Sequence, residues 1–545
     1  MSEIAFEMLL GAEPGAYRTA ATAWDRLARA LDDRADSLTA SVKRIPDAWD
    51  GAAGATAAAH CDGLRKELES AYVPVLTIAQ ALTRHADGLE ELREHAHALV
   101  ADGRRAHVTI HRDGSMEVDP GHADEWTARS LSALVWQRDE LLRAAADLDG
   151  RTARILGENT ATASGAPAAR VDRASVPPAG TDPARVKAWW DSLSAAQQRY
   201  VLAEYPEMVG NLDGIPIASR DIANRIVLDR EHDRLSGRLD ELNAREAYIL
   251  AMAEQGRGAE LYPGAGNPAG MAYTELERIR AERAEVEGKL RGIDKITNRL
   301  EHPGPDQPRA YLIGFTTADD GRSIMSVGNP DEADNVLTYV PGTGADLSKV
   351  GGDIERADRM ALDAGKAAPG ERTATILWLG YDAPDTIPAA TRDGYADGAV
   401  TDLHRFQTGL RTTHEGPPSH NTVLGHSYGS TAIGHTATRT GIDADALIFV
   451  GSPGVGTNSA SDLTGVPPDQ VWATRAEHDI IRRVPDWDVL HGNDPTREDF
   501  GGQVFTSDPG DPDNEGATHS AYWDPNNAAR RNIAYIVTGQ GGQVR

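Results

Sequence analysis

A serine held between two glycines is the first residue of this chain whose setting suggests chemistry. Ser427 lies in residues 425–429 (GHSYG), after a short apolar run at 422–424 and before small residues at 430–434. This order predicts a strand, a tight turn and a helix. Glycines leave room where the strand and the helix approach closely, and a strained turn lifts the serine hydroxyl clear of the sheet. Taken alone, the pentapeptide fits an ordinary turn serine equally well.

A serine hydroxyl becomes a nucleophile when a histidine accepts its proton and a carboxylate orients that histidine. The second half of the chain offers several residues of both types. Asp479 follows one short strand-like run, and His519 follows the next. On residue type alone the histidine role stays open among His519, His491 and His426, and the carboxylate role among Asp479, Glu477, Asp486 and Asp488. Strand alternation is expected to point His426 away from the Ser427 hydroxyl.

Eight strands should position these side chains. Several of them are unbroken apolar runs, which is typical of a parallel sheet with both faces covered. The first two form a hairpin about residues 319–321, and helical stretches separate most of the later ones. The expected strands are residues 309–316, 322–327, 335–340, 373–379, 421–426, 444–450, 470–474 and 503–506. Ser427 follows the fifth strand.

A set of signature residues upstream of the sheet carries a family resemblance. They are Trp189-Trp190, residues 211–216 (NLDGIP), Arg220-Asp221 and Asn224-Arg225. Together with the serine turn and the region around His519, they make residues 180–540 resemble the actinobacterial α/β-hydrolase family DUF1023. The resemblance implies an α/β fold, namely an α/β-hydrolase with an eight-stranded, mostly parallel sheet.

In α/β-hydrolases the catalytic order along the chain is serine, acid, histidine. The family pattern places the acid after the seventh strand and the histidine after the eighth. Asp479 and His519 fill these two places, so the resemblance implies Ser427 as nucleophile, His519 as general base and acid, and Asp479 as the orienting carboxylate.

An oxyanion hole needs two backbone N–H groups aimed at the developing charge. We expect one from Tyr428, directly after the nucleophile. We expect the other from Thr343 or Gly344, in the glycine-containing loop after the third strand. This loop lacks the G-K-[ST] and G-x-G-x-x-G patterns of nucleotide sites. We therefore expect neither a cofactor nor a metal.

The front of the chain predicts a different kind of structure. Residues 14–45 and the apolar-striped stretch at 64–99 predict two long antiparallel helices, with Pro74 as the site of a kink. Residues 49–51 (WDG) lie between them and resemble the W-x-G motif of WXG100 (ESAT-6-like) proteins, over about residues 10–105. Such proteins are substrates and partners of type VII secretion, so the resemblance implies a helical partner protein.

The change in texture along the chain predicts four parts. Two long charged stretches, 228–254 and 273–300, predict a helical hairpin that is either a solvated insertion or a cap over the active site. The parts are a WXG100-like helical domain at 1–157, a linker rich in Ala, Pro, Ser and Gly at 158–181, a helical segment at 182–300 and the catalytic domain at 301–545.

The overall composition limits the partners and the location. The chain has 545 residues and a net charge of -28, which disfavours binding to a phosphate backbone. Cys61 is the single cysteine, so neither an intrachain disulfide nor a zinc site built of cysteines can form. We find no basic, apolar leader and no membrane-spanning run. We expect a cytoplasmic protein or one exported by a type VII-like route.

These observations predict a serine hydrolase that cleaves carboxylic esters through an acyl-enzyme. Its substrate would be a small-molecule or lipid ester. One alternative is a type VII-associated interaction or effector protein in which the hydrolase half is secondary. Another is an acyltransferase with the same triad. The sequence leaves the substrate, secretion, the role of residues 182–300 as a lid and the oligomeric state open.

Overall fold

The computed structural model describes residues 5–48, 52–122, 125–160, 171–304, 307–483 and 491–545. Its contacts divide the chain into two compact units. The first comprises Met1–Val171 with Leu193–Ala203, and the second comprises Asp172–Ser192 with Glu204–Arg545. Residues 49–51, which carry the W-x-G resemblance, and residues 161–170 of the expected linker lie outside the described residues. The predicted four-part division stays a prediction.

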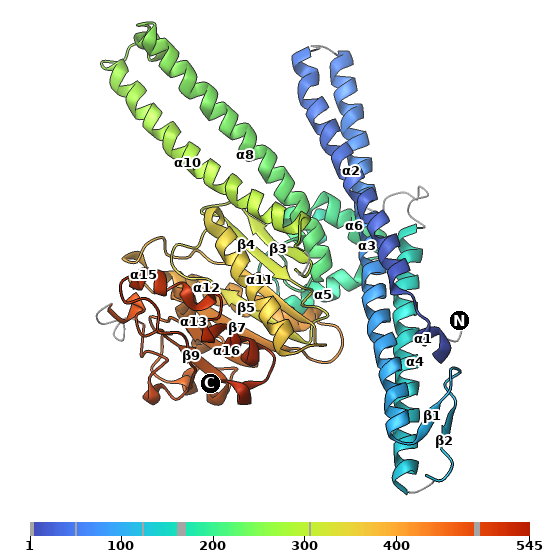
Figure 1. The fold of residues 1–545 in the computed structure, drawn as a ribbon. Coiled ribbons are helices and arrows are strands. Elements are labelled where there is room, and N and C mark those ends of the chain that lie inside the picture. The colour runs from blue at the N-terminus through green and yellow to red at the C-terminus, as the bar shows by residue number, and fades with distance from the viewer. Residues whose placement is uncertain (1–4, 49–51, 123–124, 161–170, 305–306, 484–490) are drawn as a thin grey trace. The chain divides into compact units, whose positions relative to one another are not determined.

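The first unit is built mainly from long helices. The expected hairpin is formed by α2 (Pro14–Ala48) and α3 (Ala52–Arg105), and α3 continues through Pro74. A third long helix, α4 (Glu125–Thr160), packs on α3 (Figure 1). The short helix α1 (Phe6–Leu10), the antiparallel pair β1 (Val108–Ile110) and β2 (Met116–Val118), and most of α6 (Ala195–Glu204) also belong to this unit.

Apolar side chains from all parts of the first unit form its core. One cluster joins α1, α3, β1 and α4 through Phe6, Leu9, Ala96, Leu99, Val108, Ile110, Leu134 and Ala145. A smaller cluster joins α2 to α3 through Ala21, Ile78 and Leu82. Because each stripe is buried by a helix from elsewhere in the sequence, packing stabilises these helices beyond their intrinsic propensity.

The predicted charged hairpin is present in the second unit. It consists of α8 (Ile217–Glu254) and α10 (Pro268–Glu301), with the short α9 (Gly258–Leu261) between them, and Figure 1 shows α8 and α10 side by side. Four arginine–glutamate ion pairs connect the two helices: Arg238–Glu282, Arg245–Glu275, Arg280–Glu246 and Arg283–Glu246. Apolar residues from the predicted facing stripes are buried in the same cluster that covers one face of the sheet.

The second unit contains the predicted eight-stranded sheet, in the order β10-β9-β8-β7-β5-β6-β4-β3. Only β4 runs against the others, because its pairs with β3 and β6 are antiparallel and the remaining pairs are parallel. The strands are β3 (Ala310–Thr316), β4 (Arg322–Val327), β5 (Asn335–Val340), β6 (Thr373–Leu379), β7 (His420–His426), β8 (Ala446–Val450), β9 (Val471–Thr474) and β10 (Gln503–Val504). The predicted strands are confirmed to within two residues at each end.

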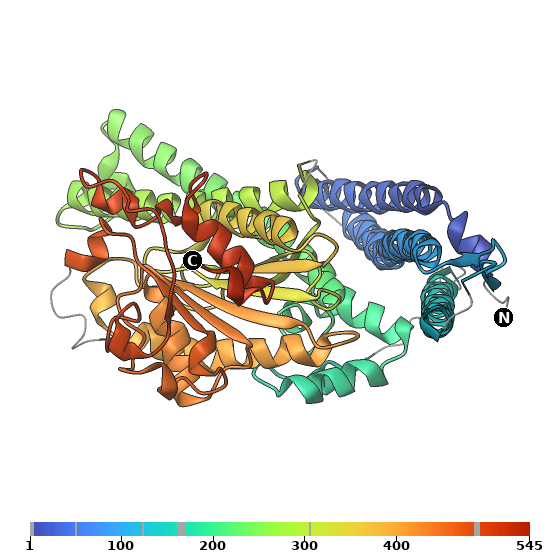
Figure 2. The same cartoon turned by 60° about the horizontal axis from the view of Figure 1, so that its bottom comes forward.

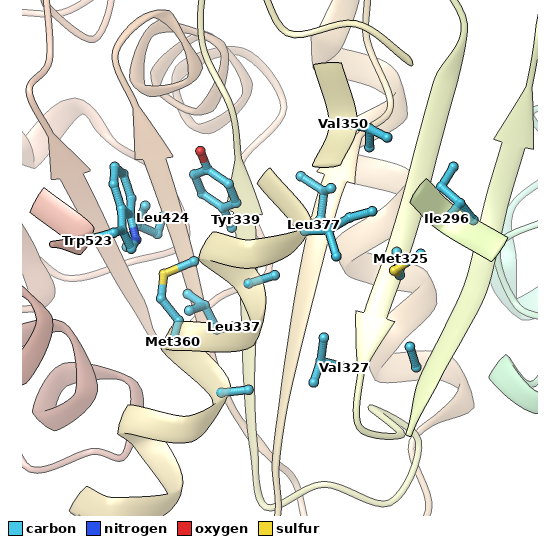
Figure 3. Close-up of a cluster of buried hydrophobic side chains, with 14 of the residues drawn as sticks. Ile296, Met325, Val327, Leu337, Tyr339, Val350, Met360, Leu377, Leu424 and Trp523 are labelled. Atoms are coloured by element: carbon cyan, nitrogen blue, oxygen red, sulfur yellow. The ribbon is translucent and has the colours of Figure 1, made fainter. Parts of the chain in front are cut away.

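Helices cover both faces of this sheet (Figure 2). One face packs against α11 (Val350–Ala367) and α16 (Ala528–Val537), and the other against α12 (Gly394–Thr413) and α13 (Tyr428–Arg439). Figure 3 shows the first layer, where Met360 of α11 lies over Leu337 of β5 and Trp523 lies beside Leu424 of β7. Burial on both faces explains why these strands are continuous apolar runs.

The polar signature residues cover the exposed edge of β3. Asn211 accepts a hydrogen bond from the Phe315 N–H and donates one to its carbonyl, at 2.9 and 3.0 Å. Asp221 accepts from the Leu312 N–H at 2.8 Å, and Asn224 donates to the Leu312 carbonyl at 3.2 Å. An unpaired strand edge is a template for aggregation, and here side chains occupy it. The signature is therefore structural at these positions.

Candidate active site

Ser427 stands at the turn between β7 and α13 in a strained backbone conformation. Its φ of 54° and ψ of -130° put a non-glycine residue in a region that L side chains rarely adopt. Glycine is required on both sides of the Ser427 turn because neighbouring backbone atoms lie too close to leave room for a side chain. A Cβ at Gly425 would lie 2.6 Å from Ser430 Cα, and one at Gly429 would lie 2.2 Å from the Val340 carbonyl oxygen. The turn is the one that the pentapeptide predicts.

Asp479 and His519 are brought together from the loops after β9 and β10. The His519 Nδ1 lies 2.7 Å from Asp479 Oδ1. Because an ionised carboxylate only accepts hydrogen bonds, His519 donates from Nδ1 and keeps Nε2 free to accept a proton. Asp479 is 1% exposed and also accepts from the Tyr522 hydroxyl at 2.5 Å and the Ile481 N–H at 2.9 Å. These bonds fix the carboxylate.

Tyr522 is a site residue that the sequence analysis missed. Its hydroxyl donates to Asp479 and accepts from the Ala476 N–H at 2.9 Å, so it connects the acid to the end of β9. Burial and the neighbouring Asp479 charge raise the pKa of Tyr522 well above its ordinary value, which keeps it a hydrogen-bond donor. Its position three residues after His519, one helical turn away, is the only sequence signal for it.

Ser427 and His519 line the same pocket. Within the described residues, the structure records no hydrogen bond between Ser427 Oγ and the His519 ring. Catalytic hydrogen bonds are often long before a substrate binds and shorten in the complex. The arrangement places an oriented imidazole and a strained serine around one cavity.

The loop after β5 lies directly against the serine turn. A Cβ at Gly342 would be 2.9 Å from the Tyr428 nitrogen, so backbone alone fits here. Tyr428 is the first residue of α13, and its N–H has no acceptor within the helix. The Gly344 N–H donates to the Pro384 carbonyl at 2.8 Å. It is therefore not free to bind an oxyanion, and of the two loop candidates Thr343 remains.

The two rival histidines are engaged elsewhere. His426 Nε2 lies 2.7 Å from the His519 carbonyl oxygen, and burial lowers the pKa of His426 well below its ordinary value. His491 Nε2 lies 2.8 Å from the Ala390 carbonyl, and its Nδ1 lies 2.8 Å from Asp393. Glu477 is exposed. Asp486 and Asp488 lie outside the described residues.

The pocket around Ser427 has a volume of about 760 Å³. Its walls come from loops at the carboxyl ends of the strands and from the start of α11, which is where ligands bind in open α/β sheets. None of the residues found to line it belongs to 182–300, so within the described chain the α8–α10 hairpin does not form its wall.

Among the described residues, no group of three or more His, Cys, Asp or Glu side chains is placed to hold a metal ion. No helix of the described chain is long and apolar enough to cross a lipid bilayer.

Two families match different parts of the chain. The alpha/beta hydrolase family, formerly DUF1023, matches residues 317–489, which include β4 to β9 and the Ser427 turn. The PPE family, whose helical region is WXG100-like, matches residues 3–108, which include α1, α2 and α3. Both expected resemblances are confirmed.

The relatives are uncharacterized proteins of mycobacteria. One from Mycobacterium tuberculosis is 28% identical over 403 residues, which are 67% of this chain and 57% of that protein. One from Mycobacterium bovis is 32% identical over 211 residues, which are 36% of this chain and 77% of that protein. This chain thus spans little more than half the length of the first relative.

A solved structure of FAE aligns with 13% identity and a TM-score of 0.28, over 43% of this chain and 91% of that one. A score this low supports no inference. The strand order, the strained serine and the matched residues define the class of the second unit as an α/β-hydrolase. The chain belongs to the alpha/beta hydrolase family.

Proposed function

We propose that this protein is a serine hydrolase that cleaves carboxylic esters through an acyl-enzyme. The observation that carries the proposal is the Asp479–His519 pair, joined at 2.7 Å, whose histidine lines the same pocket as the strained Ser427. Membership of the alpha/beta hydrolase family supports it. The activity of the whole protein is also a proposal, because the relatives in the comparison have no assigned activity from which to infer it.

The reaction follows from the roles of these residues. His519 Nε2 takes the proton from Ser427 Oγ as the oxygen attacks the ester carbonyl carbon. The N–H groups of Tyr428 and Thr343 bind the oxyanion, and Asp479 stabilises the imidazolium. The tetrahedral intermediate expels the alkoxide, which takes the proton from His519. Water then attacks the acyl-enzyme by the same route, which releases the acid and restores Ser427.

Kinetics of single and double variants test this proposal. Ser427→Ala and His519→Ala should each lower kcat on an ester by about a thousandfold or more, and the double variant should lose no more than either alone. His232 of α8 offers a matched control, since its side chain is partly exposed and is not among the residues that line the pocket. Losses that multiply in the double variant would contradict a shared mechanism.

We further propose that the first unit binds a helical partner protein and directs export by a type VII-like route. The match of residues 3–108 to the PPE family favours this second function, which is compatible with the first. Amounts of the protein in culture medium should fall when the secretion system of the host is deleted. Equal amounts in the cytosol with and without that system, and none in the medium, would contradict export.

A further inference from the structure

The pocket around Ser427 has two chemically different walls. The wall formed by the start of α11 is polar and presents Lys349, Asp353 and Arg356. The second wall is apolar and comes from three loops, those after β6, β8 and β9. It consists of Ile387, Ala390, Pro453, Ile480 and Ile481. A ligand in this pocket therefore has both charged and aliphatic side chains within the lining.

Both cations of the polar wall already bind carboxylates. Lys349 Nζ lies 2.6 Å from Asp346 Oδ2 and donates to the Gly344 carbonyl at 3.0 Å. Arg356 Nη1 lies 3.0 Å from Asp353 Oδ1 and 3.0 Å from the Tyr339 hydroxyl. A phosphate or carboxylate on the substrate would compete with these carboxylates for the two cations. The charge of the polar wall is thus balanced, and an uncharged ligand fits it best.

Two aliphatic side chains of the apolar wall are exposed to solvent. Ile387 is 59% exposed and Ile480 is 37% exposed, and they come from different loops. They are the two isoleucines among the exposed large hydrophobic residues of the described chain, and both line this pocket. Single exposed apolar residues are ordinary, but apolar side chains gathered at one cavity mark a place that an apolar ligand covers.

We propose that the acyl part of the substrate is an uncharged aliphatic chain of medium length, which lies along Ile387, Ile480 and Ile481. This inference rests on the proposed ester hydrolysis and names its substrate class. The volume of about 760 Å³ is within the range of pockets that hold drug-sized ligands, so it exceeds what an acetyl group needs. The ester carbonyl lies at Ser427, and the methylenes extend from it along the apolar wall.

A series of p-nitrophenyl esters tests the inference on the full chain. We expect kcat/KM to rise at least tenfold from acetate through butyrate to octanoate, measured below micelle concentrations. Each methylene that becomes buried contributes up to about fourfold. Ile387→Asp and Ile480→Asp place charges on the apolar wall and should each lower the octanoate-to-acetate ratio of kcat/KM severalfold. The double variant should bring the ratio close to one.

Leu250→Asp is the matched control. Leu250 is 41% exposed on α8 and does not line the pocket, so its replacement should leave the ratio as in the wild type. The two isoleucines are partly in solvent, so the variants should fold, and each ratio is internal to one variant. A flat series in an active wild type, or an unchanged ratio in both Ile387→Asp and Ile480→Asp, would overturn the acyl-chain inference and leave ester hydrolysis standing. No turnover of any ester, with no reaction of Ser427 toward a fluorophosphonate, would instead overturn the proposed function.

Discussion

His426 connects the serine turn to the histidine that faces it. Its Nε2 lies 2.7 Å from the His519 carbonyl oxygen, and the two rings lie 4.9 Å apart between centroids. Burial, with the nearby His519 and Arg356, lowers the pKa of His426, so the ring is neutral and donates from Nε2 to that carbonyl. His426 is thus a positioning residue that holds the backbone of His519.

Two replacements of His426 separate the hydrogen bond from the ring. Glutamine keeps an N–H donor near the same place, whereas phenylalanine keeps a ring without a donor. We expect His426→Phe to lower kcat by about tenfold because His519 loses a fixed position, and His426→Gln to lower it by less. Steady-state kinetics with both variants check this. Equal losses in the two variants would show that the hydrogen bond does not matter.

The sequence predicted the candidate site at the level of residue type and order. Ser427 was placed by its glycine-flanked turn after a strand, and Asp479 and His519 by the family pattern, which puts the acid after the seventh strand and the histidine after the eighth. Gly344 was assigned wrongly to the oxyanion hole, since its N–H binds the Pro384 carbonyl, a contact between two loops far apart in sequence. Tyr522 was missed for the same kind of reason. Side-chain partners across loops have no periodicity from which to predict them.

Among the secondary-structure elements, the turn from β7 to α13 forms only because backbone segments can lie very close to each other there. A Cβ at Gly429 would lie 2.2 Å from the Val340 carbonyl oxygen, and backbone cannot move away cheaply. Gly365 of α11 has no atom within 4 Å of the place of its Cβ. The two positions therefore allow a direct comparison of glycine-to-alanine changes.

Gly429→Ala should destabilise the protein by about 3 kcal/mol or more through this overlap. Gly365→Ala should instead stabilise it by about 0.5–1 kcal/mol, because alanine is the better helix former. Urea unfolding of both variants checks the pair. A Gly429→Ala protein as stable as the wild type would mean that the turn can open at little cost.

The edge of β3 offers a second test at this scale. Asp221 is fully buried and binds both the Leu312 N–H and Arg225, so Asp221→Ala removes the acceptor of a strand N–H and the carboxylate that pairs with a cation. We expect a loss of about 3 kcal/mol in the free energy of unfolding. Asp191, half-exposed and paired with Lys187, is the control, and Asp191→Ala should cost less than about 1 kcal/mol. A similar effect of both changes on urea unfolding would argue against edge covering.

The strands were predictable because several of them are continuous apolar runs and turn signals separate them. The covering of β3 by Asn211, Asp221 and Asn224 was not, because a polar residue on a helix gives no sign of the strand that it will meet. The family signature identified these residues but did not indicate what they do in the structure. Only the hydrogen bonds to Leu312 and Phe315 supply it.

At the scale of the second unit, one carboxyl group connects three separate segments. Asp331, in the loop between β4 and β5, accepts from the Ile217 N–H of α8 at 2.7 Å and from the Thr413 hydroxyl of α12 at 2.6 Å. It is 5% exposed, and this burial raises the pKa of Asp331 to about 7 despite both hydrogen bonds. The connection therefore responds to pH.

The raised pKa of Asp331 determines how the stability of the protein changes with pH. Between the ordinary value of 3.8 and about 7, the folded state keeps a proton that the unfolded state releases, so stability falls as pH rises. The contribution is full below the ordinary value and is lost through pH 7, with a total of about 4 kcal/mol. Asp331→Asn removes this titration.

Urea unfolding from pH 4 to pH 8 tests the role of Asp331. The wild type should lose stability relative to Asp331→Asn as pH rises, whatever constant offset the amide introduces. Parallel stability curves for the two proteins would show that Asp331 titrates at its ordinary pKa.

The proposed function requires that Ser427 is a nucleophile activated by His519. Covalent labelling of the Ser427 hydroxyl tests this requirement without knowledge of the substrate. The full chain is treated with a fluorophosphonate, digested and analysed by mass spectrometry. We expect one adduct, on the peptide that carries Ser427, which is absent in Ser427→Ala and forms far more slowly in His519→Ala. An adduct that persists in Ser427→Ala, or that forms at the wild-type rate in His519→Ala, would contradict the proposed function.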